Sequence, residues 1–336
     1  MARKKLGRQS VRFENPPVII GSSSIVGKKE NDGPLGKYFD MFLNDDMWGE
    51  KTFEKAEKRF FSEAIKLAIK KTGLKEEQID CLIGGDLLNH IITAGFAARD
   101  FAIPFLGLYG ACSTMAESLV LGSCLIDGGF ADYVVCATSS HFSTAERQFR
   151  FPLELGNQRT PTSQWTVTGA GASILAANGT GPVITGATFG KIVDMGIKDV
   201  NNMGAAMAPA ALDTIVTHFN DNNLTPDYYD LIITGDLGKL GREILMEKAF
   251  EMGLDLSNRY TDCGCEIYSP EQDTHQGGSG CGCSAVVLNG YLIKKLTDKT
   301  YNRILFAATG AMMSTTSSMQ GESIPSIVYA LSLESR

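Results

Sequence analysis

A cysteine set among small residues is the part of this sequence best suited to chemistry. The string Gly110-Ala111-Cys112-Ser113 follows a short apolar run, 103–109, and precedes a pattern typical of a buried helix, 115–126. We therefore expect Cys112 on a sharp turn at a helix N-terminus, where backbone N–H groups and the positive end of the helix dipole gather. Such surroundings lower the pKa of a thiol and make it a better nucleophile. The alternative is a small core cysteine packed beneath the start of a helix.

The segments that must position this turn alternate between apolar strands, glycine-rich turns and helices. Apolar spacing predicts strands over 17–21, 80–86, 133–137 and 170–176 and a helix over 53–71, with Gly73 as its C-cap. This alternation is typical of an α/β protein.

Segments of the first half recur in the same order in the second half. Residues 17–21 resemble 182–186, residues 82–87 resemble 232–237, and residues 137–139 resemble 308–310. The Cys112 turn has a counterpart at 280–284. We infer two similar α/β halves, residues 1–178 and 179–336, that pack about a pseudo-twofold axis with a site where their turns converge.

Composition and charge narrow the class of protein. A chain of 336 residues is long enough for two domains or one duplicated domain, and its net charge of −7 argues against general nucleic-acid binding. No apolar run approaches the ~20 residues that span a bilayer, and nothing apolar follows the basic residues 1–8, so we expect no secretory signal. The basic tail is either solvated or a tether to an acidic partner or an anionic membrane. The eight cysteines are then expected to be reduced thiols.

The duplicated architecture resembles the thiolase-like superfamily, which includes thiolases and ketoacyl synthases. Residues 110–113 match the nucleophile turn of that superfamily, 167–173 resemble the glycine-rich closing strand of its first half, and 277–280 resemble the glycine-rich turn of its second half. The resemblance implies a layered αβαβα core. By analogy, it also implies a homodimer formed through the sheet edge of the first half.

Nearly the whole chain is also similar to the stage V sporulation protein AD family of spore-forming bacteria. The strings that carry this similarity are 32–36, 85–89, 110–114, 137–141, 144–150 and 206–211. The resemblance implies a protein that binds dipicolinic acid (pyridine-2,6-dicarboxylate), either free or as its calcium chelate. It implies a cytosol-facing component of a channel complex, peripheral on the spore inner membrane, that contacts other channel subunits and loads this compound into the developing spore.

The acyl-transfer chemistry of the superfamily looks incomplete here. That chemistry needs a His–His or His–Asn pair beside the cysteine. In ketoacyl synthases the first histidine follows the strand written here as 231–235, where this chain has Asp236. The second donor position falls near Ser279, with His275 close by as a substitute. An ionised Asp236 would raise the thiol pKa, against the helix dipole. We expect a non-catalytic protein with Cys112 as a vestigial nucleophile; the alternative is an acyltransferase that uses Cys112.

A pyridine dicarboxylate needs donors for two carboxylates and apolar walls for its ring. Backbone N–H groups at the helix start after Cys112 are candidates for one carboxylate. Segment 141–164 supplies the further candidates His141, Arg147, Gln148, Arg150, Gln158, Arg159 and Gln164. Arg147 and Arg150 share a face on a helix. Salt bridges are the alternative role for the two arginines, and a structural hydrogen bond is the alternative for His141.

Asp86 and Asp236 occupy matching positions in the two halves. Helix N-capping is one role for them, and contact with the calcium or the pyridine side of the ligand is the other. We expect no metal or cofactor bound by the protein itself. The pairs Cys263-x-Cys265 and Cys281-x-Cys283 have a one-residue gap, which is shorter than that of zinc-binding pairs. The predicted ligand-binding residues are Asp86, Cys112, His141, Arg147, Arg150, Asp236, His275 and Ser279.

Overall fold

The computed structural model describes residues 3–149, 153–155 and 158–336, and its large sheet consists of two parts with the same strand order, called here the first and the second sheet. The first sheet runs β3 (Val18–Gly27), β9 (Gly169–Ala176), β7 (Tyr133–Ser140), β5 (Cys81–Asp86) and β6 (Phe105–Gly107). The second runs β10 (Val183–Thr188), β15 (Ser326–Glu334), β14 (Arg303–Ala311), β11 (Leu231–Thr234) and β12 (Tyr260–Asp262). In each sheet two antiparallel pairings are followed by two parallel ones. The repeated order confirms the duplicated fold, and the pairing of β3 with β10 makes the two sheets continuous.

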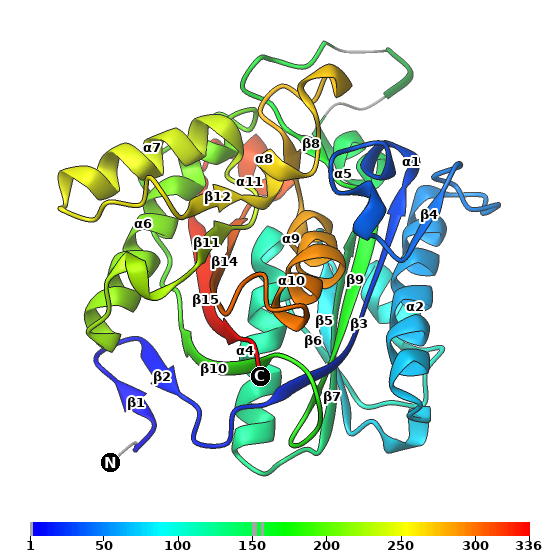
Figure 1. The fold of residues 1–336 in the computed structure, drawn as a ribbon. Helices are drawn as coiled ribbons and strands as arrows, with labels where there is room; N and C mark the ends of the chain where they lie inside the picture. Colours follow the sequence, from blue (N-terminus) through cyan, green and yellow to red (C-terminus); the bar gives the residue numbers. More distant parts are fainter. Residues whose placement is uncertain (1–2, 150–152, 156–157) are drawn as a thin grey trace.

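Helices form three layers around the two sheets (Figure 1). Helices α2 (Phe53–Thr72) and α3 (Ile92–Ala98) cover the outer face of the first sheet. Helices α6 (Met203–Asn222) and α7 (Gly238–Glu251) cover the outer face of the second. Helices α4 (Thr114–Asp127) and α9 (Cys281–Val287) lie between the sheets. The result is the αβαβα arrangement that the resemblance to the thiolase-like superfamily implies.

Smaller elements complete the described chain. They are β1 (Lys5–Leu6), β2 (Ser10–Arg12), α1 (Lys28–Asn31), β4 (Met41–Leu43), α5 (Phe142–Phe149), β8 (Trp165–Thr166), α8 (Cys263–Glu266), β13 (Gly278–Ser279), α10 (Ile293–Thr297) and α11 (Thr315–Met319), with short 3-10 or π turns that include η3 (Ala111–Ser113) and η7 (Leu288–Leu292). Among all described residues, no helix is both long enough and apolar enough to cross a membrane.

Helix α2 illustrates how the sequence pattern builds an outer layer. Thr52 caps its first turn by accepting a hydrogen bond from the backbone N–H of Lys55. Phe60, Phe61 and other apolar residues at three- and four-residue spacing are fully buried against the sheet. Gly73 ends the helix in the left-handed conformation, with φ of 74°. The prediction of a helix over 53–71 is therefore confirmed.

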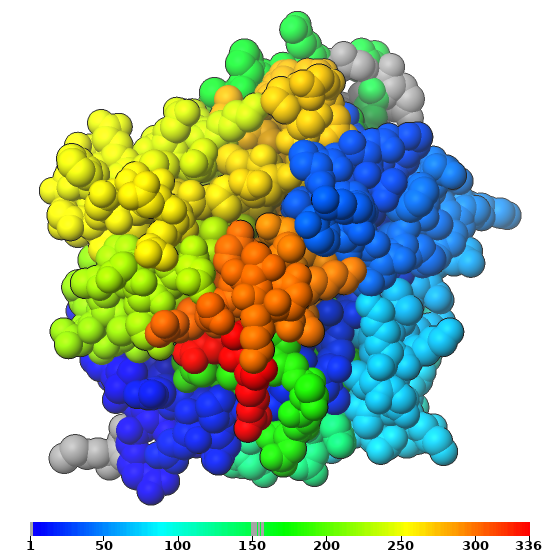
Figure 2. All heavy atoms as spheres, viewed as in Figure 1, coloured from blue at the N-terminus to red at the C-terminus, as the bar shows by residue number. Residues whose placement is uncertain are grey.

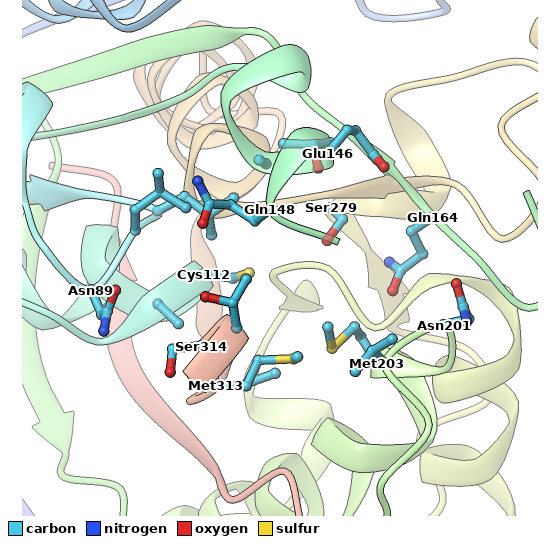
Figure 3. Close-up of a pocket in the computed structure, with 18 of the residues that line it drawn as sticks. Asn89, Cys112, Glu146, Gln148, Gln164, Asn201, Met203, Ser279, Met313 and Ser314 are labelled. Carbon is cyan, nitrogen blue, oxygen red and sulfur yellow. The ribbon is translucent and has the colours of Figure 1, made fainter. Parts of the chain in front are cut away.

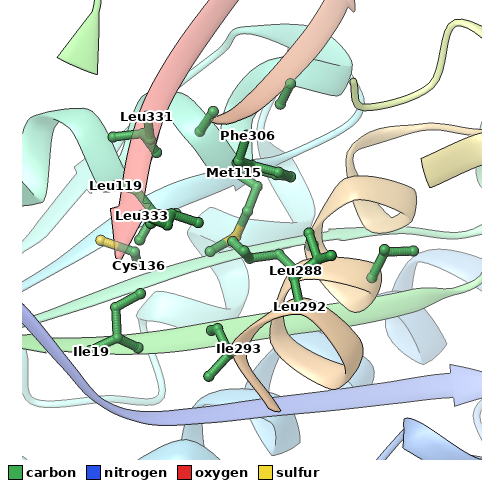
Figure 4. Packing of buried hydrophobic residues seen from close by; sticks show 14 of the residues in the cluster. Ile19, Met115, Leu119, Cys136, Leu288, Leu292, Ile293, Phe306, Leu331 and Leu333 are labelled. Carbon is green, nitrogen blue, oxygen red and sulfur yellow. The ribbon is translucent and has the colours of Figure 1, made fainter. Parts of the chain in front are cut away.

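The central layer holds the largest apolar cluster (Figure 4). Met115 and Leu119 of α4 meet Leu288, at the end of α9, and side chains from both sheets such as Phe306 and Leu331. All five are fully buried, and burial of each such side chain contributes about 1.5–3 kcal/mol. Helix α4 has apolar residues around most of its circumference because it is packed between the first and the second sheet.

The N-terminal strands β1 and β2 belong to the first half of the sequence but pack against the second half of the structure. Strand β2 pairs with β10, and the carboxylate of Asp221 on α6 accepts hydrogen bonds from the backbone N–H groups of Arg8, Gln9 and Ser10. Figure 2 shows this segment, in dark blue, beneath the yellow-green surface of α6. The first residues described thus pack against the C-terminal half of the chain.

Candidate functional site

Cys112 lies on the sharp turn that its sequence context predicts. It occupies the 3-10 turn η3, directly before helix α4. Ala111 adopts a φ of 50°, in the left-handed region that costs a residue with a side chain free energy. Hydroxyl groups brace the turn: Ser113 donates to Gly110 O at 2.7 Å, and Thr114 donates to Ala111 O at 2.7 Å. The strained geometry of a nucleophile turn is therefore present.

The thiol of Cys112 is nevertheless poorly suited to ionise. Burial raises its pKa well above the usual value, and the nearby carboxyl group of Asp236 raises it further by charge and by a side-chain hydrogen bond. The backbone N–H of Gly280 acts in the opposite direction but does not outweigh these effects. The expectation of a lowered thiol pKa at the helix start is wrong, and the predicted opposing effect of Asp236 is confirmed. The thiol is neutral at physiological pH.

Asp236 is the centre of a buried hydrogen-bond network. Its Oδ1 accepts a hydrogen bond from Thr309 Oγ1 at 2.7 Å. Its Oδ2 accepts from Gly280 N at 2.8 Å and from Ser279 Oγ at 3.2 Å, and the carboxylate also accepts from the thiol of Cys112. Burial raises the pKa of Asp236 to about 6, although these bonds oppose the shift. Near neutral pH this carboxyl group is mostly ionised, so the surrounding donors point toward it.

A pocket of about 170 Å³ opens beside Cys112 and Ser279, between the two halves (Figure 3). Residues from 87–90, 145–148, 163–166, 200–203 and 311–316 line it. The first and last of these segments follow the carboxyl ends of parallel strands β5 and β14, the edge at which α/β proteins commonly bind ligands. In Figure 3 the side chains of Cys112, Ser279, Met203 and Met313 face a common space.

The lining of this pocket is mostly neutral. Its apolar side chains include Tyr109, Met203 and Met313. Its polar groups are amides and hydroxyls from Asn89, Gln148, Ser163, Gln164, Thr166, Asn201, Ser279, Ser314, Thr315 and Thr316. His90 and Glu146 are the titratable side chains at the wall besides Cys112 and Tyr109, and no lysine or arginine lines the pocket among the residues that the structure describes.

Asp86 and His141, two of the predicted ligand contacts, are buried in structural roles away from the pocket lining. The carboxylate of Asp86 accepts hydrogen bonds from Leu88 N at 3.1 Å and from Ala94 N at 2.8 Å, which caps helix α3. His141 Nε2 lies 3.0 Å from Asp46 O, and its Nδ1 accepts from Ser143 N at 3.1 Å. Burial lowers the pKa of His141, so the ring is neutral.

The remaining predicted contacts have other partners or lie outside the description. Arg147 forms an ion pair with Glu54 and does not line the pocket. His275 Nδ1 lies 2.6 Å from Thr160 O, and its Nε2 lies 3.2 Å from Asp273. Arg150 lies outside the described residues. Of the predicted set, the structure brings together Cys112, Asp236 and Ser279.

The matching acids of the duplication have diverged. Asp86 caps the helix that follows its own strand, but the corresponding helix α7 is held by Asp262, which accepts from Leu237 N at 2.9 Å and from Gly238 N at 3.0 Å. Asp236 is thereby free to face Cys112. Among the described residues, no group of three or more His, Cys, Asp or Glu side chains could hold a metal ion.

Sequence reasoning missed most of the pocket wall. The sequence pattern does not identify Asn89, Asn201, Met203 or Met313 as wall residues, although Asn89 and Met313 follow the ends of strands β5 and β14. Position after a parallel strand was the signal that would have identified these two. Asn201 and Met203 lie at the start of α6, and nothing local distinguishes them.

Two comparisons with known proteins, one with family models and one with individual relatives, identify the same family. The family model described as stage V sporulation protein AD matches residues 7–334. The stage V sporulation protein AD of Bacillus subtilis (strain 168) is 45% identical over 331 residues, which cover 98% of each chain.

Solved structures with similar folds include a 3-oxoacyl-(acyl-carrier-protein) synthase and OleA. The 3-oxoacyl-(acyl-carrier-protein) synthase III of Aquifex aeolicus VF5 matches with a TM-score of 0.56 and 14% identity, over 95% of this chain and 99% of that one. Cerulenin-bound OleA of Xanthomonas campestris matches with a TM-score of 0.62 and 15% identity, over 95% and 97%. At these identities the likeness shows the thiolase-like fold alone.

Proposed function

The chain belongs to the stage V sporulation protein AD family, and from that premise we propose that it binds dipicolinic acid in the pocket beside Cys112 without catalysing acyl transfer. We further propose that it acts on the spore inner membrane, as a peripheral component of the channel complex that loads dipicolinate into the developing spore. The ligand, the complex and the location come from the family resemblance.

The observation that carries the non-catalytic part of the proposal is the contact between Asp236 and the thiol of Cys112. Acyl transfer through a cysteine needs a thiolate and a donor for the developing oxyanion. Here the neighbouring carboxylate raises the pKa of the thiol and accepts hydrogen bonds from the groups around it, including Ser279. Removal of the thiol proton would leave two negative charges, the thiolate of Cys112 and the carboxylate of Asp236, buried side by side.

The pocket suits a small planar ligand with polar ends. A single water needs roughly 10–15 Å³ of such space, so a cavity of about 170 Å³ has room for a small organic molecule. Tyr109, Met203 and Met313 offer apolar surface for an aromatic ring. Side-chain amides such as Asn89 and Asn201 offer N–H donors for a carboxylate.

Calorimetric titration with dipicolinate tests the proposal. We expect binding by the unaltered protein and at least a tenfold loss of affinity in Asn201→Trp, which fills part of the pocket. Asn258→Trp, at an exposed position outside the pocket, is the matched control and should bind normally. Titrations with and without calcium distinguish the free acid from its chelate. Absence of binding in both arms would contradict the proposal.

The acyltransferase alternative is tested on the same protein. Incubation with acetyl-CoA followed by intact mass measurement should leave Cys112 unmodified. An acetyl adduct on Cys112, together with no dipicolinate binding, would favour the enzyme instead.

We also propose that two copies associate through the edge of the first sheet. Strand β6 lies at that edge, and Leu106 together with Ile92 and Phe96 of the neighbouring α3 is between 43% and 52% exposed. An exposed edge strand beside apolar side chains favours pairing with another chain. Light scattering during size-exclusion chromatography should give a dimer for the unaltered protein and a monomer for Leu106→Lys. A monomer in both would contradict this association.

The proposed attachment to the spore membrane runs through other subunits of the channel. The purified protein should therefore not float with protein-free vesicles of anionic lipid, and it should enter the membrane fraction of sporulating cells only when those subunits are present. Flotation with bare vesicles would point to direct binding of the membrane.

A further inference from the structure

Ser279 and Gln164 line the end of the pocket beside Asp236, and both present hydrogen-bond acceptors there. Resting on the dipicolinate binding proposed above, we propose that Ser279 and Gln164 receive the ligand there through a protonated carboxyl group, so that the protein binds dipicolinate together with one proton. The ligand class would then be a carboxylic acid in its singly protonated form.

Ser279 is turned into an acceptor by its partner. Its hydroxyl has one hydrogen, and that hydrogen points to Asp236 Oδ2 at 3.2 Å. The oxygen lone pairs of Ser279 remain for the pocket that this residue lines. The thiol of Cys112 is held in its protonated form by burial and by the nearby carboxylate of Asp236.

Gln164 is a second acceptor, and its orientation is set by two backbone carbonyl groups. Its Nε2 lies 2.7 Å from Asp236 O and 2.8 Å from Gly278 O. Because carbonyl oxygens only accept, the amide nitrogen must face them and the amide cannot be flipped. Its Oε1 is buried with no hydrogen-bond partner among the described residues. In Figure 3 the amide end of Gln164 turns toward the space between Ser279 and Met203.

A buried acceptor without a donor is unfavourable, and a carboxylate placed against it would add repulsion between lone pairs. A protonated carboxyl group supplies the missing O–H. The second, ionised carboxylate of the ligand would meet the amide of Asn89, which lies across the pocket from Gln164 in Figure 3.

The thiols and the tyrosine hydroxyl around this end cannot take up the proton, because they are already protonated at neutral pH. Burial raises the pKa values of Cys112, Cys263, Cys281, Cys283 and Tyr109, so these groups already hold their protons firmly. Asp236 and Asp262 are the carboxyl groups behind the pocket, and His90 and Glu146 are the titratable groups at its wall.

Calorimetry in two buffers of different ionisation enthalpy measures the protons taken up on binding. Near pH 7.5 we expect about one proton per dipicolinate and an affinity that falls about tenfold for each unit of rising pH. The monoamide, 6-carbamoylpyridine-2-carboxylate, carries a permanent N–H donor. It should bind without proton uptake and with an affinity independent of pH.

Variants show whether the proton taken up on binding resides on the ligand or on Asp236. The double variant Ser279→Ala with Gln164→Met removes both acceptors and should reduce proton uptake to less than half, with thermal unfolding as the check on folding. Asn258→Met, at an exposed position outside the pocket, should leave the uptake unchanged. Dipicolinate binding with no proton uptake would overturn this inference and leave the proposed function standing. Full uptake in the double variant that disappears in Asp236→Asn would assign the proton to Asp236 and overturn it as well. Failure of dipicolinate to bind at all would remove the proposed function.

Discussion

The hydroxyl group of Thr144 lies 2.7 Å from Oε2 of Glu57, a fully buried carboxyl group on helix α2. The same hydroxyl lies 2.9 Å from His141 O, and its single hydrogen cannot serve both contacts. Both are satisfied when Glu57 is protonated and donates to Thr144. Burial, followed by the charge of Asp86, raises the pKa of Glu57 to about 8, in agreement with that assignment. The first half therefore holds a neutral glutamic acid at physiological pH.

Glu57→Gln should reduce the loss of stability at alkaline pH. The pKa of Glu57 is higher in the folded than in the unfolded protein, so its contribution is full below about pH 4.5 and is lost as the pH rises through about 8. Glutamine keeps the neutral form. Near pH 9 the variant should exceed the unaltered protein in the free energy of unfolding by about 1–3 kcal/mol, as measured with urea. Glu63→Gln, at a partly exposed position on the same helix, is the control and should change little.

His218 should make the protein sensitive to acid. Burial lowers its pKa to about 4, and it bridges Thr188 at 2.8 Å and Tyr229 at 2.7 Å. Because the folded pKa is below that of the unfolded chain, the contribution is full above about pH 6.5 and falls as the pH drops toward 4. The stability advantage over His218→Gln should shrink by about 2 kcal/mol between pH 7 and pH 5. An advantage that stays constant with pH would show that the ring charges freely in the folded state.

The Asp236→Asn variant should make Cys112 more reactive. Removal of the carboxylate charge lowers the pKa of the thiol, while burial still limits access. At pH 8 we expect alkylation of Cys112 by iodoacetamide to be slow in the unaltered protein and several times faster in the variant, as measured by peptide mass mapping. Cys124, which is partly exposed, provides the internal reference in both proteins. Equal rates at Cys112 in the two proteins would contradict the assigned role of Asp236.

The Asp221→Ala variant should release the N-terminal strand pair. The carboxylate accepts three backbone N–H groups, at 3.1, 2.9 and 2.9 Å. Its loss should lower the free energy of unfolding by about 1–3 kcal/mol and expose Arg8 and Arg12 to trypsin. N-terminal sequencing of the digest measures this cleavage, and Asp227→Ala, at an exposed position in the same half, should cleave at the unaltered rate. Protection of the segment in both variants would show that pairing with β10 is sufficient.

The sequence by itself determined the duplicated α/β fold, helix α2 and the turn that carries Cys112. These features depend on apolar spacing and on glycines close to one another in the chain, so local patterns record them. The family could be recognised for a related reason, because its characteristic strings are short and contiguous.

Only the tertiary structure decided how the site works. The choice between a reactive and a neutral thiol depended on burial and on Asp236, neither of which the neighbours of Cys112 in the chain reveal. The contacts that orient Gln164 join residues 72 and 114 positions apart, and the hydrogen bond from Ser279 to Asp236 spans 43. Hydrogen-bond direction and desolvation arise where distant segments meet. The sequence, through its family resemblance, therefore predicted that Asp236 and Ser279 lie near the cysteine, and the packing of the two halves set their protonation and their orientation.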